Sequence, residues 1–300
     1  MKKKVEHVLG VVYGQSKTGK TLATVRAFPD GLFVAPPGAL TCSKWLDWEP
    51  KVVPVTRSAG FKYIIEVVKK AQKNYKAIVI DDLSLLADAE LQACKKMVAG
   101  FAAFDLFNNR VYDLRDTCRE AQCHVFFTCH EQAPREVKKD NFNRYIPGGP
   151  LMPGWQVTEK LPAMADFVAR VVYDEDAPGW PYLYDTNPDQ NYITGDRLAI
   201  LPGRFPLNLR EALLGAGYDL PRPKPLAWME DHVERISHLL SPVLADPKQD
   251  LKTTLQPEGA ALIKNNHSQR HVRWVLADAL DRAVLRQHND NLLTSFINSF

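Results

Sequence analysis

The sequence predicts an α/β protein whose sheet is mostly parallel. Over the first two-thirds of the chain, short apolar strand-like runs alternate with amphipathic helical stretches. A glycine-rich loop at residues 14–21 joins a β-branched run to a helical segment. A second apolar run, at residues 77–80, leads directly into two aspartates. Runs of this kind, apolar throughout and four to six residues long, are typical of strands that are buried on both faces.

The glycine-rich loop fits the pattern G-x-x-x-x-G-K-[ST] at every defined position, and it lies between a strand and a helix as that pattern requires. In such a loop the backbone N–H groups and the helix N-terminus bind phosphate oxygens. Lys20 is expected to reach the β- and γ-phosphates, and the Thr21 hydroxyl to ligate Mg²⁺. The predicted nucleotide-binding residues are Gly14, Gln15, Ser16, Lys17, Thr18, Gly19, Lys20 and Thr21.

The next elements continue the alternation. We expect a strand at residues 31–35 that ends at two prolines. We also expect a strand at 51–55, and place it at the sheet edge because Pro54 has no backbone N–H to donate to a neighbouring strand. A helix is predicted over 61–75, where apolar residues form one stripe and lysines occupy the opposite side.

The strand at 77–80 brings Asp81 to its carboxyl end, the position at which a carboxylate can hold Mg²⁺ beside the phosphates. The alternative for Asp81 is a simple cap for the following helix. Asp82 has two equally supported roles, orienting or activating the attacking water or capping the helix that starts near Ser84. Helical pattern then extends to about residue 122, with a break near Gly100.

The following buried strand, residues 124–130, is expected to neighbour the one that ends in Asp81. His130 at its end is a candidate contact for the γ-phosphate or the attacking water, or else an ordinary hydrogen-bonded histidine. Glu131 is a second candidate base.

Residues 134–162 contain several Pro and Gly and little periodicity, which predicts a long functional or mobile loop. Cations and aromatic rings alternate in it, the combination that binds single-stranded nucleic acid. Acidic residues leave the loop nearly neutral, so a solvated loop or a subunit contact is the alternative. The residues concerned are Arg135, Lys138, Lys139, Phe142, Arg144, Tyr145 and Trp155.

Strand signals return at residues 166–173, 181–185 and 192–194, and we expect these to form an antiparallel meander at the sheet edge. Arg170, Arg197 and Arg204 are candidates for an arginine that reaches across a subunit boundary, or are surface residues.

Residues 226–300 have a helical pattern, and a proline-rich stretch precedes them. We therefore divide the chain into a core at 1–220 and a C-terminal helical region at 221–300.

Composition sets few further limits. The five cysteines form no C-x-x-C pair, and the net charge of +3 does not by itself indicate nucleic acid. No stretch reaches the roughly 20 apolar residues that span a membrane. The basic start of the chain leads into a strand rather than a signal sequence, so we expect a cytoplasmic protein, in the host cytoplasm if it is viral.

With these motifs in place, the chain resembles the RecA-superfamily P-loop ATPases. More narrowly, it is similar to compact phage ATPases of recombination and single-strand annealing. The narrower likeness rests on residues 126–131, on 147–154 with 161–162 and 166–170, and on 194–197. The resemblance implies a RecA-like core, ATP with Mg²⁺, a homo-oligomer and single-stranded DNA as partner.

Two positions depart from this family. RecA-type recombinases carry a catalytic glutamate at the end of the strand after the P-loop helix, where this chain has Ala35-Pro36-Pro37. Their sensor residue is commonly glutamine, and here it is His130. Catalysis is therefore expected to depend on Asp82 or Glu131, or hydrolysis to be slow.

The sequence as a whole favours an ATP- and Mg²⁺-dependent ATPase that binds DNA. A viral DNA-packaging or helicase-loading motor, an assembly protein that binds nucleotide with little turnover, and a small-molecule kinase are the alternatives.

Overall fold

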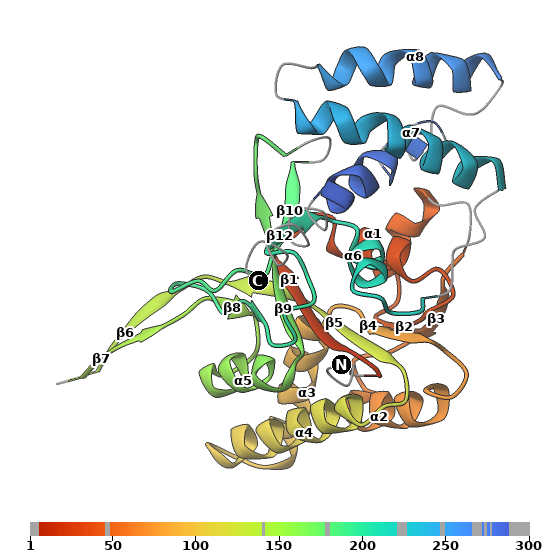
Figure 1. The fold of residues 1–300 in the computed structure, drawn as a ribbon. Coiled ribbons are helices and arrows are strands. Elements are labelled where there is room, and N and C mark those ends of the chain that lie inside the picture. The colour runs from red at the N-terminus through yellow and green to blue at the C-terminus, as the bar shows by residue number, and fades with distance from the viewer. Residues whose placement is uncertain are drawn as a thin grey trace.

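A mixed β-sheet crosses the centre of the molecule, and helices cover both of its faces (Figure 1). The computed structural model describes residues 6–45, 49–139, 142–177, 181–220, 227–246, 250–265, 272, 275–276 and 278–287. The strands of the sheet are β1 (Leu9–Gly14), β2 (Leu32–Ala35), β3 (Lys51–Pro54), β4 (Ala77–Ile80), β5 (His124–Gln132), β8 (Gly149–Pro150), β9 (Phe167–Tyr173), β10 (Tyr182–Asp185), β11 (Gly195–Asp196) and β12 (Arg204–Pro206).

The strand order is β12-β10-β9-β1-β5-β4-β2-β3, and the six strands from β9 to β3 run parallel. Strands β8, β10, β11 and β12 pair antiparallel. The predicted α/β fold class, mostly parallel with antiparallel edge strands, is therefore confirmed. Strand β3 lies at the end of this order, as its Pro54 requires.

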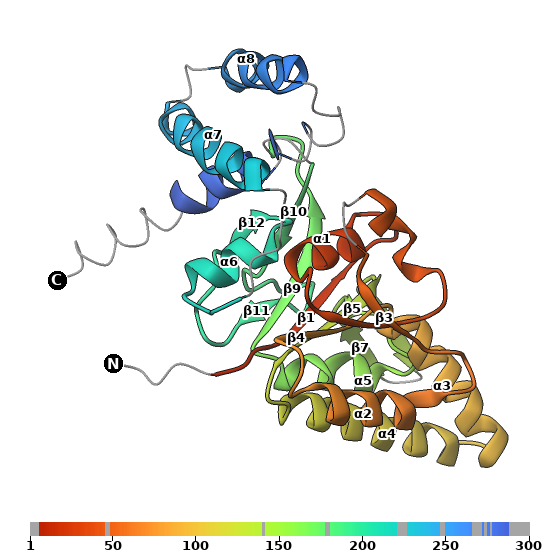
Figure 2. The same cartoon turned by 90° about the vertical axis from the view of Figure 1, so that its right-hand side faces the viewer.

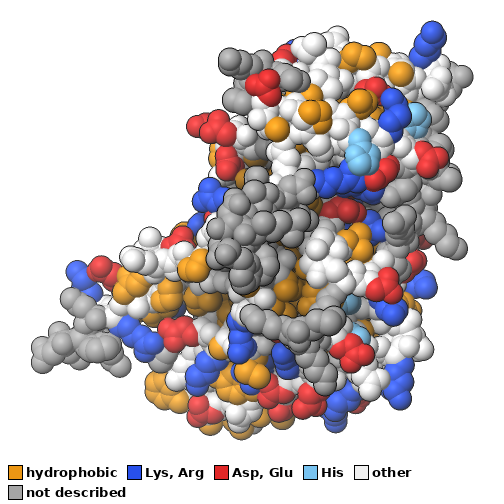
Figure 3. All heavy atoms as spheres, in the orientation of Figure 1, with side chains coloured by type: hydrophobic (Ala, Val, Ile, Leu, Met, Phe, Trp, Pro, Cys, Tyr) orange, Lys and Arg blue, Asp and Glu red, His pale blue; other side chains and the backbone are white. Residues whose placement is uncertain are grey.

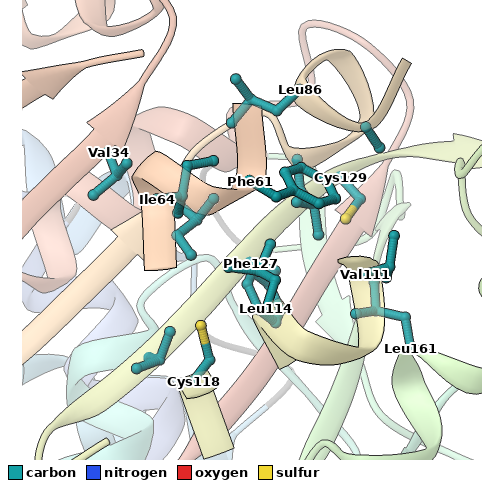
Figure 4. Packing of buried hydrophobic residues seen from close by; sticks show 14 of the residues in the cluster. Val34, Phe61, Ile64, Leu86, Val111, Leu114, Cys118, Phe127, Cys129 and Leu161 are labelled. Atoms are coloured by element: carbon teal, nitrogen blue, oxygen red, sulfur yellow. The ribbon is translucent and has the colours of Figure 1, made fainter. Parts of the chain in front are cut away.

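Two groups of helices sandwich the sheet. On one face, α2 (Gly60–Ala71), α3 (Leu83–Met97), α4 (Ala102–Arg119) and α5 (Trp155–Lys160) close a large apolar core. Figure 4 shows side chains of this core, among them Phe61 and Leu114 from the helices and Val34 and Phe127 from the sheet. On the other face lie α1 (Lys20–Ala27) and α6 (Leu209–Gly215). Two short 3₁₀ helices, Ala39–Trp45 and Pro162–Met164, complete this part of the chain.

The C-terminal region contains α7 (Ala227–Ala245), α8 (Leu251–Lys264) and a further helical segment at 278–287. Figure 2 shows α7 and α8 stacked beyond the α1 and α6 face. Their apolar side chains form a cluster of their own with residues such as Val275 and Ala279, as the helical spacing predicts. Leu285, however, is buried in the core between the sheet, α1 and α6. Arg26 of α1 also pairs with Asp278 at 3.2 Å, so this last segment is attached to the P-loop helix.

The prediction of a long loop at 134–162 is wrong in its secondary structure. Strands β6 (Arg135–Lys139) and β7 (Phe142–Ile146) pair antiparallel and form a two-stranded β-ribbon that projects from the sheet (Figure 1). The ribbon was not predicted because neither of its strands, Arg-Glu-Val-Lys-Lys and Phe-Asn-Arg-Tyr-Ile, has the regular apolar–polar alternation of a half-buried strand. Strand β8 and helix α5 occupy the rest of the segment.

The predicted antiparallel meander is corrected in two places. Strand β9 is an inner strand that runs parallel to β1, and the antiparallel strands begin only with β10. Its residues from Phe167 to Ala169 are buried, as expected of a strand covered on both faces. Tyr192 makes a single bridge to Gly148 instead of a strand at 192–194, and the turn predicted at 177–179 lies partly outside the described residues.

Within the part of the chain that the structure describes, no helix combines the length and the apolar composition needed to cross a bilayer.

Candidate functional site

The glycine-rich loop forms a tight connection between β1 and α1. Lys17 (φ 65°) and Gly19 (φ 93°) adopt left-handed backbone conformations, and Gly19 immediately precedes the helix. A Cβ atom at Gly14 would lie 2.8 Å from Cβ of Val171 on the neighbouring strand, so only glycine fits there. The Thr18 hydroxyl donates to the Gln15 carbonyl at 3.0 Å and closes the loop. The loop therefore has the compact geometry of a phosphate-binding turn.

Lys20 is buried and folds back over the loop. Its ammonium group donates to the carbonyls of Gly14 (2.9 Å) and Gln15 (2.5 Å). Burial lowers the pKa of Lys20, and the negative charge of nearby Asp82 opposes that shift. The amine is thus held at the mouth of the loop, where a cation can meet phosphate oxygens.

Asp81 occupies the carboxyl end of β4 and accepts two hydroxyl hydrogen bonds. Thr21 donates to it at 3.1 Å and Thr128 at 2.5 Å. Burial raises the pKa of the Asp81 carboxyl, while the hydrogen bonds from Thr128 and Thr21 act in the opposite direction. Thr21 and Asp81, predicted as the metal-binding pair, are therefore in direct contact.

Asp82 combines the two roles that the sequence left open. One of its carboxylate oxygens accepts from the backbone N–H of Leu85 at 3.2 Å and caps α3. The other lies 2.9 Å from Nε2 of His130. Asp82 also has a left-handed backbone conformation (φ 32°, ψ 74°), which is uncommon for a residue other than glycine and concentrates at functional sites. The pair of Asp82 and His130 faces the P-loop.

Glu131 does not join this group. Side chains alternate along a strand, so Glu131 points to the opposite face of the sheet from His130. It is bound there by the Arg170 guanidinium through two contacts of 2.9 and 3.1 Å. This geometry does not support Glu131 as the catalytic base.

A pocket of about 440 Å³ lies over the loop at the carboxyl ends of β1, β4 and β5. It brings together most of the predicted site residues, but Gly14, Gln15, Thr18 and Glu131 do not line it. Its lining consists of Ser16, Lys17, Gly19, Lys20, Thr21, Leu22, Ala39, Cys42, Asp81, Asp82, Thr128, Cys129 and His130.

Sequence reasoning missed Thr128, which holds Asp81, and the wall formed by Ala39 and Cys42. Thr128 lies two residues before His130, so strand alternation places both on the pocket face, and that signal was available. The wall comes from a 3₁₀ helix that no pattern in the sequence indicates.

The donor set fits Mg²⁺ bound together with a nucleotide. Among the described residues, no cluster of three or more His, Cys, Asp or Glu side chains is arranged to hold a metal by itself. Mg²⁺ normally takes one or two protein oxygens and completes its shell with phosphates and water. The contact between Thr21 and Asp81, beside the Lys20 amine, provides those protein oxygens.

Residues 7–198 match the family model of the AAA domain. The chain belongs to the AAA domain family. This match covers β1 to β11, including the whole pocket, and shows a nucleotide-binding P-loop domain of the ATPase type. No curated protein matches the chain. A solved KaiC-like protein from the hyperthermophilic archaeon Pyrococcus horikoshii OT3 is similar over 60% of this chain and 78% of that chain, with a TM-score of 0.36 and 15% sequence identity.

The three candidate arginines of this AAA domain protein differ in their surroundings. Arg170 is bound within its own chain by Glu131 and lies 3.3 Å from the ring centre of Tyr192. Arg197 is exposed and donates to the carbonyl of Ala163. Arg204 is 56% exposed and pairs with Asp185.

On the β-ribbon of the AAA domain, Arg135 and Lys138 are exposed, and Tyr145 is 47% exposed. Arg144 pairs with Glu159 of α5 at 3.1 Å. Figure 3 shows basic and acidic side chains together on the projecting ribbon. The side chains of Lys139, Phe142 and Trp155 lie outside the described residues.

Proposed function

We propose that this AAA domain protein is a Mg²⁺-dependent ATP hydrolase that acts on single-stranded DNA, in recombination, annealing or replication of the phage type. The observation that carries the proposal is the pocket itself. It combines the P-loop, the contact between Thr21 and Asp81, and the pair of Asp82 and His130 at the ends of three adjacent elements.

Binding of the nucleotide rests on residues that the fold has already brought together. Backbone N–H groups of the loop would bind the phosphates, and so would the Lys20 ammonium group once it exchanges the Gly14 and Gln15 carbonyls for phosphate oxygens. Thr21 with Asp81 would hold the metal. Mg²⁺ supplies positive charge that neutralises the phosphate oxygens. Because Thr21 and Asp81 are already in contact, this pair needs little rearrangement to place positive charge where negative charge develops during hydrolysis.

For the attacking water we propose the pair of Asp82 and His130. The chain has no glutamate at the end of β2, where residues 35–37 are Ala-Pro-Pro. Asp82 holds the His130 ring by Nε2, which fixes the orientation of the imidazole at the edge of the pocket. An imidazole fixed in this way can position a water or accept its proton.

The β-ribbon supports the DNA part of the proposal. It projects away from the sheet and continues β5, the strand that carries His130. Exposed Arg135 and Lys138 offer charge to a phosphate backbone, and the exposed ring of Tyr145 offers a surface for base stacking.

We also propose that the protein acts as a homo-oligomer, in a ring or a filament. Arg197 and Arg204 are the exposed candidates for an arginine that completes a neighbouring site. The test mixes Lys20→Ala protein, which is inactive but keeps both arginines, with Arg197→Ala or Arg204→Ala protein, which keeps an intact P-loop. If the arginine acts in trans, the Lys20→Ala subunit supplies it to the neighbouring site, and ATP turnover is regained in the mixture.

The deciding experiment is steady-state ATP hydrolysis with single-stranded DNA, with duplex DNA and without DNA. Single strands should stimulate wild-type turnover, and Lys20→Ala should abolish it under all three conditions. Lys69→Ala, on the exposed side of α2, is the matched control and should behave as wild type. Stimulation by duplex alone would contradict the single-strand proposal and favour a packaging or helicase-loading motor.

A second function is favoured by the state of Asp82, whose two carboxylate oxygens are both engaged, one in the helix cap and one with His130. A pocket without a free carboxylate suits an assembly protein that binds nucleotide and turns it over slowly. Tight ATP binding without turnover under any of the three conditions would support this alternative.

A further inference from the structure

Glu131, Arg170 and Tyr192 form a compact cluster on the sheet face opposite the nucleotide pocket, and we call this cluster the arginine clamp. Arg170 contacts both carboxylate oxygens of Glu131, and its guanidinium stacks on the Tyr192 ring at 3.3 Å from the ring centre. Glu131 is 6% exposed and Arg170 21%, so solvent screens their attraction only in part. The clamp fixes the position of Tyr192 relative to the end of β5.

Tyr192 in turn holds the base of the β-ribbon. Its segment bridges to Gly148, with the Gly148 N–H donating to the Asn191 carbonyl at 2.7 Å and the Ile193 N–H donating back to the Gly148 carbonyl at 2.8 Å. A Cβ atom at Gly148 would lie 2.5 Å from the Tyr192 ring, so the two are in the closest possible packing. The Tyr145 hydroxyl of the ribbon also donates to the side chain of Asn191 at 2.8 Å.

The same strand end carries the residue that faces the nucleotide. Glu131 follows His130 directly, and the His130 carbonyl accepts from the N–H of Leu151, just beyond β8 on the return from the ribbon. A shift of His130 against a phosphate would act on Glu131 through the backbone, and on Arg170 and Tyr192 through the contacts of the clamp. The path from pocket to ribbon is a continuous series of contacts.

One buried polar atom beside the clamp, the Tyr13 hydroxyl, is without a hydrogen-bond partner among the described residues. Tyr13 lies opposite Arg170 in the pairing of β1 with β9, and burial raises its pKa strongly. An unsatisfied buried group is costly, so a rearrangement of the strand end that gives the Tyr13 hydroxyl a partner would be favoured.

We propose that the arginine clamp couples nucleotide binding at the P-loop to the β-ribbon, with Arg170 and Tyr192 as positioning residues. The proposal deepens the proposed function, because it rests on nucleotide occupying the pocket and on the ribbon as the responsive element. It also assigns Arg170 a role within its own chain instead of at a subunit boundary.

The test is hydrogen exchange of the ribbon amides, residues 135–146, with and without Mg²⁺ and a non-hydrolysable ATP analogue. In the wild type, nucleotide should change ribbon exchange by about 10-fold, which lies within the usual range for coupled sites. Tyr192→Leu removes the ring face, and the change should fall below about 2-fold. Tyr192→Phe keeps the ring and should keep the wild-type response. P-loop amides should be protected equally in all three proteins.

Two results would overturn the coupling. In one, nucleotide changes ribbon exchange in Tyr192→Leu as much as in the wild type. In the other, nucleotide protects the P-loop amides of the wild type but leaves its ribbon exchange unchanged. Failure to protect the P-loop would instead overturn the proposed function. A ribbon response without DNA stimulation of turnover would remove only the DNA part. If Tyr192→Leu does not fold, Arg170→Lys replaces it, since lysine keeps the charge but cannot grip Glu131 bidentately or stack as a plane.

Discussion

The two faces of β5 at its carboxyl end carry two polar clusters of different origin. On one face, Thr128 and His130 meet the P-loop, and almost everything they contact comes from short, recognisable motifs. On the other face, Glu131 meets Arg170 and Tyr192, which lie 39 positions and more along the chain. Neighbours in sequence thus belong to different sites. The contrast teaches that a chemical role has to be assigned by the face of a strand as well as by its position.

Lys20→Ala, a change on the pocket face, should have the largest effect on ATP turnover. We expect ATP turnover to fall about 100- to 1,000-fold, since a preoriented cation is lost from the place where charge develops. Steady-state hydrolysis and nucleotide titration measure it. The thermal stability of the variant should match that of Lys69→Ala; a large drop in melting temperature would mean that Lys20 is structural instead.

Asp82→Asn should separate catalysis from binding on the same face. Turnover is expected to fall about 100-fold, because the His130 ring loses its charged partner. Nucleotide affinity should change little, since Asp82 is not part of the metal pair. Asp88→Asn, an exposed change on the same helix, serves as control. Combining Asp82→Asn with His130→Gln should cost little more than either change alone, and additive losses would show that the two residues do not act as a pair.

Gly148→Ala probes the opposite face. The added methyl group would meet the Tyr192 ring, and overpacking of this kind costs about 1–3 kcal/mol. At Gly149 the nearest atom would be 3.2 Å from the new Cβ, so Gly149→Ala should cost less. Thermal unfolding of the two variants gives the comparison. Equal stabilities would contradict the tight packing at the base of the β-ribbon.

The smallest effect should be a pH dependence that belongs to the pocket alone. Burial raises the pKa of Asp81, and metal binding requires its ionised form. The affinity for nucleotide with Mg²⁺ should therefore weaken by a few-fold as the pH falls, beginning above the range of an ordinary aspartate. Titrations across pH 4–8 with and without Mg²⁺ measure it. An equal dependence in the absence of metal would exclude Asp81 as its source.

Much of the pocket face could be predicted from sequence because its geometry is local. The loop needs glycine at fixed positions, and the short β-branched apolar run before Asp81 is typical of a buried strand. Even here, side-chain alternation along β5 was not used. It would have placed Glu131 on the face opposite His130, and Thr128 on the same face as His130.

The other face could not be predicted because its contacts join distant segments. Nothing near Arg170 in sequence indicates Glu131 or Tyr192 as its partners. The β-ribbon was not predicted because its two strands, which pair with each other, lack a regular apolar–polar alternation. The prediction that β9 lies at the sheet edge was wrong because its parallel partner β1 is more than 150 residues away in sequence, and no local pattern indicates that pairing.

The position of Leu285 has a consequence for biosynthesis. The P-loop and α1 leave the ribosome early, but the apolar layer that covers α1 and the sheet includes a side chain that is made some 260 residues later. At translation rates of about 5–20 residues per second, that layer stays incomplete for many seconds. In the nascent chain, the part of this layer that Leu285 covers therefore stays exposed until the segment at 278–287 emerges and docks.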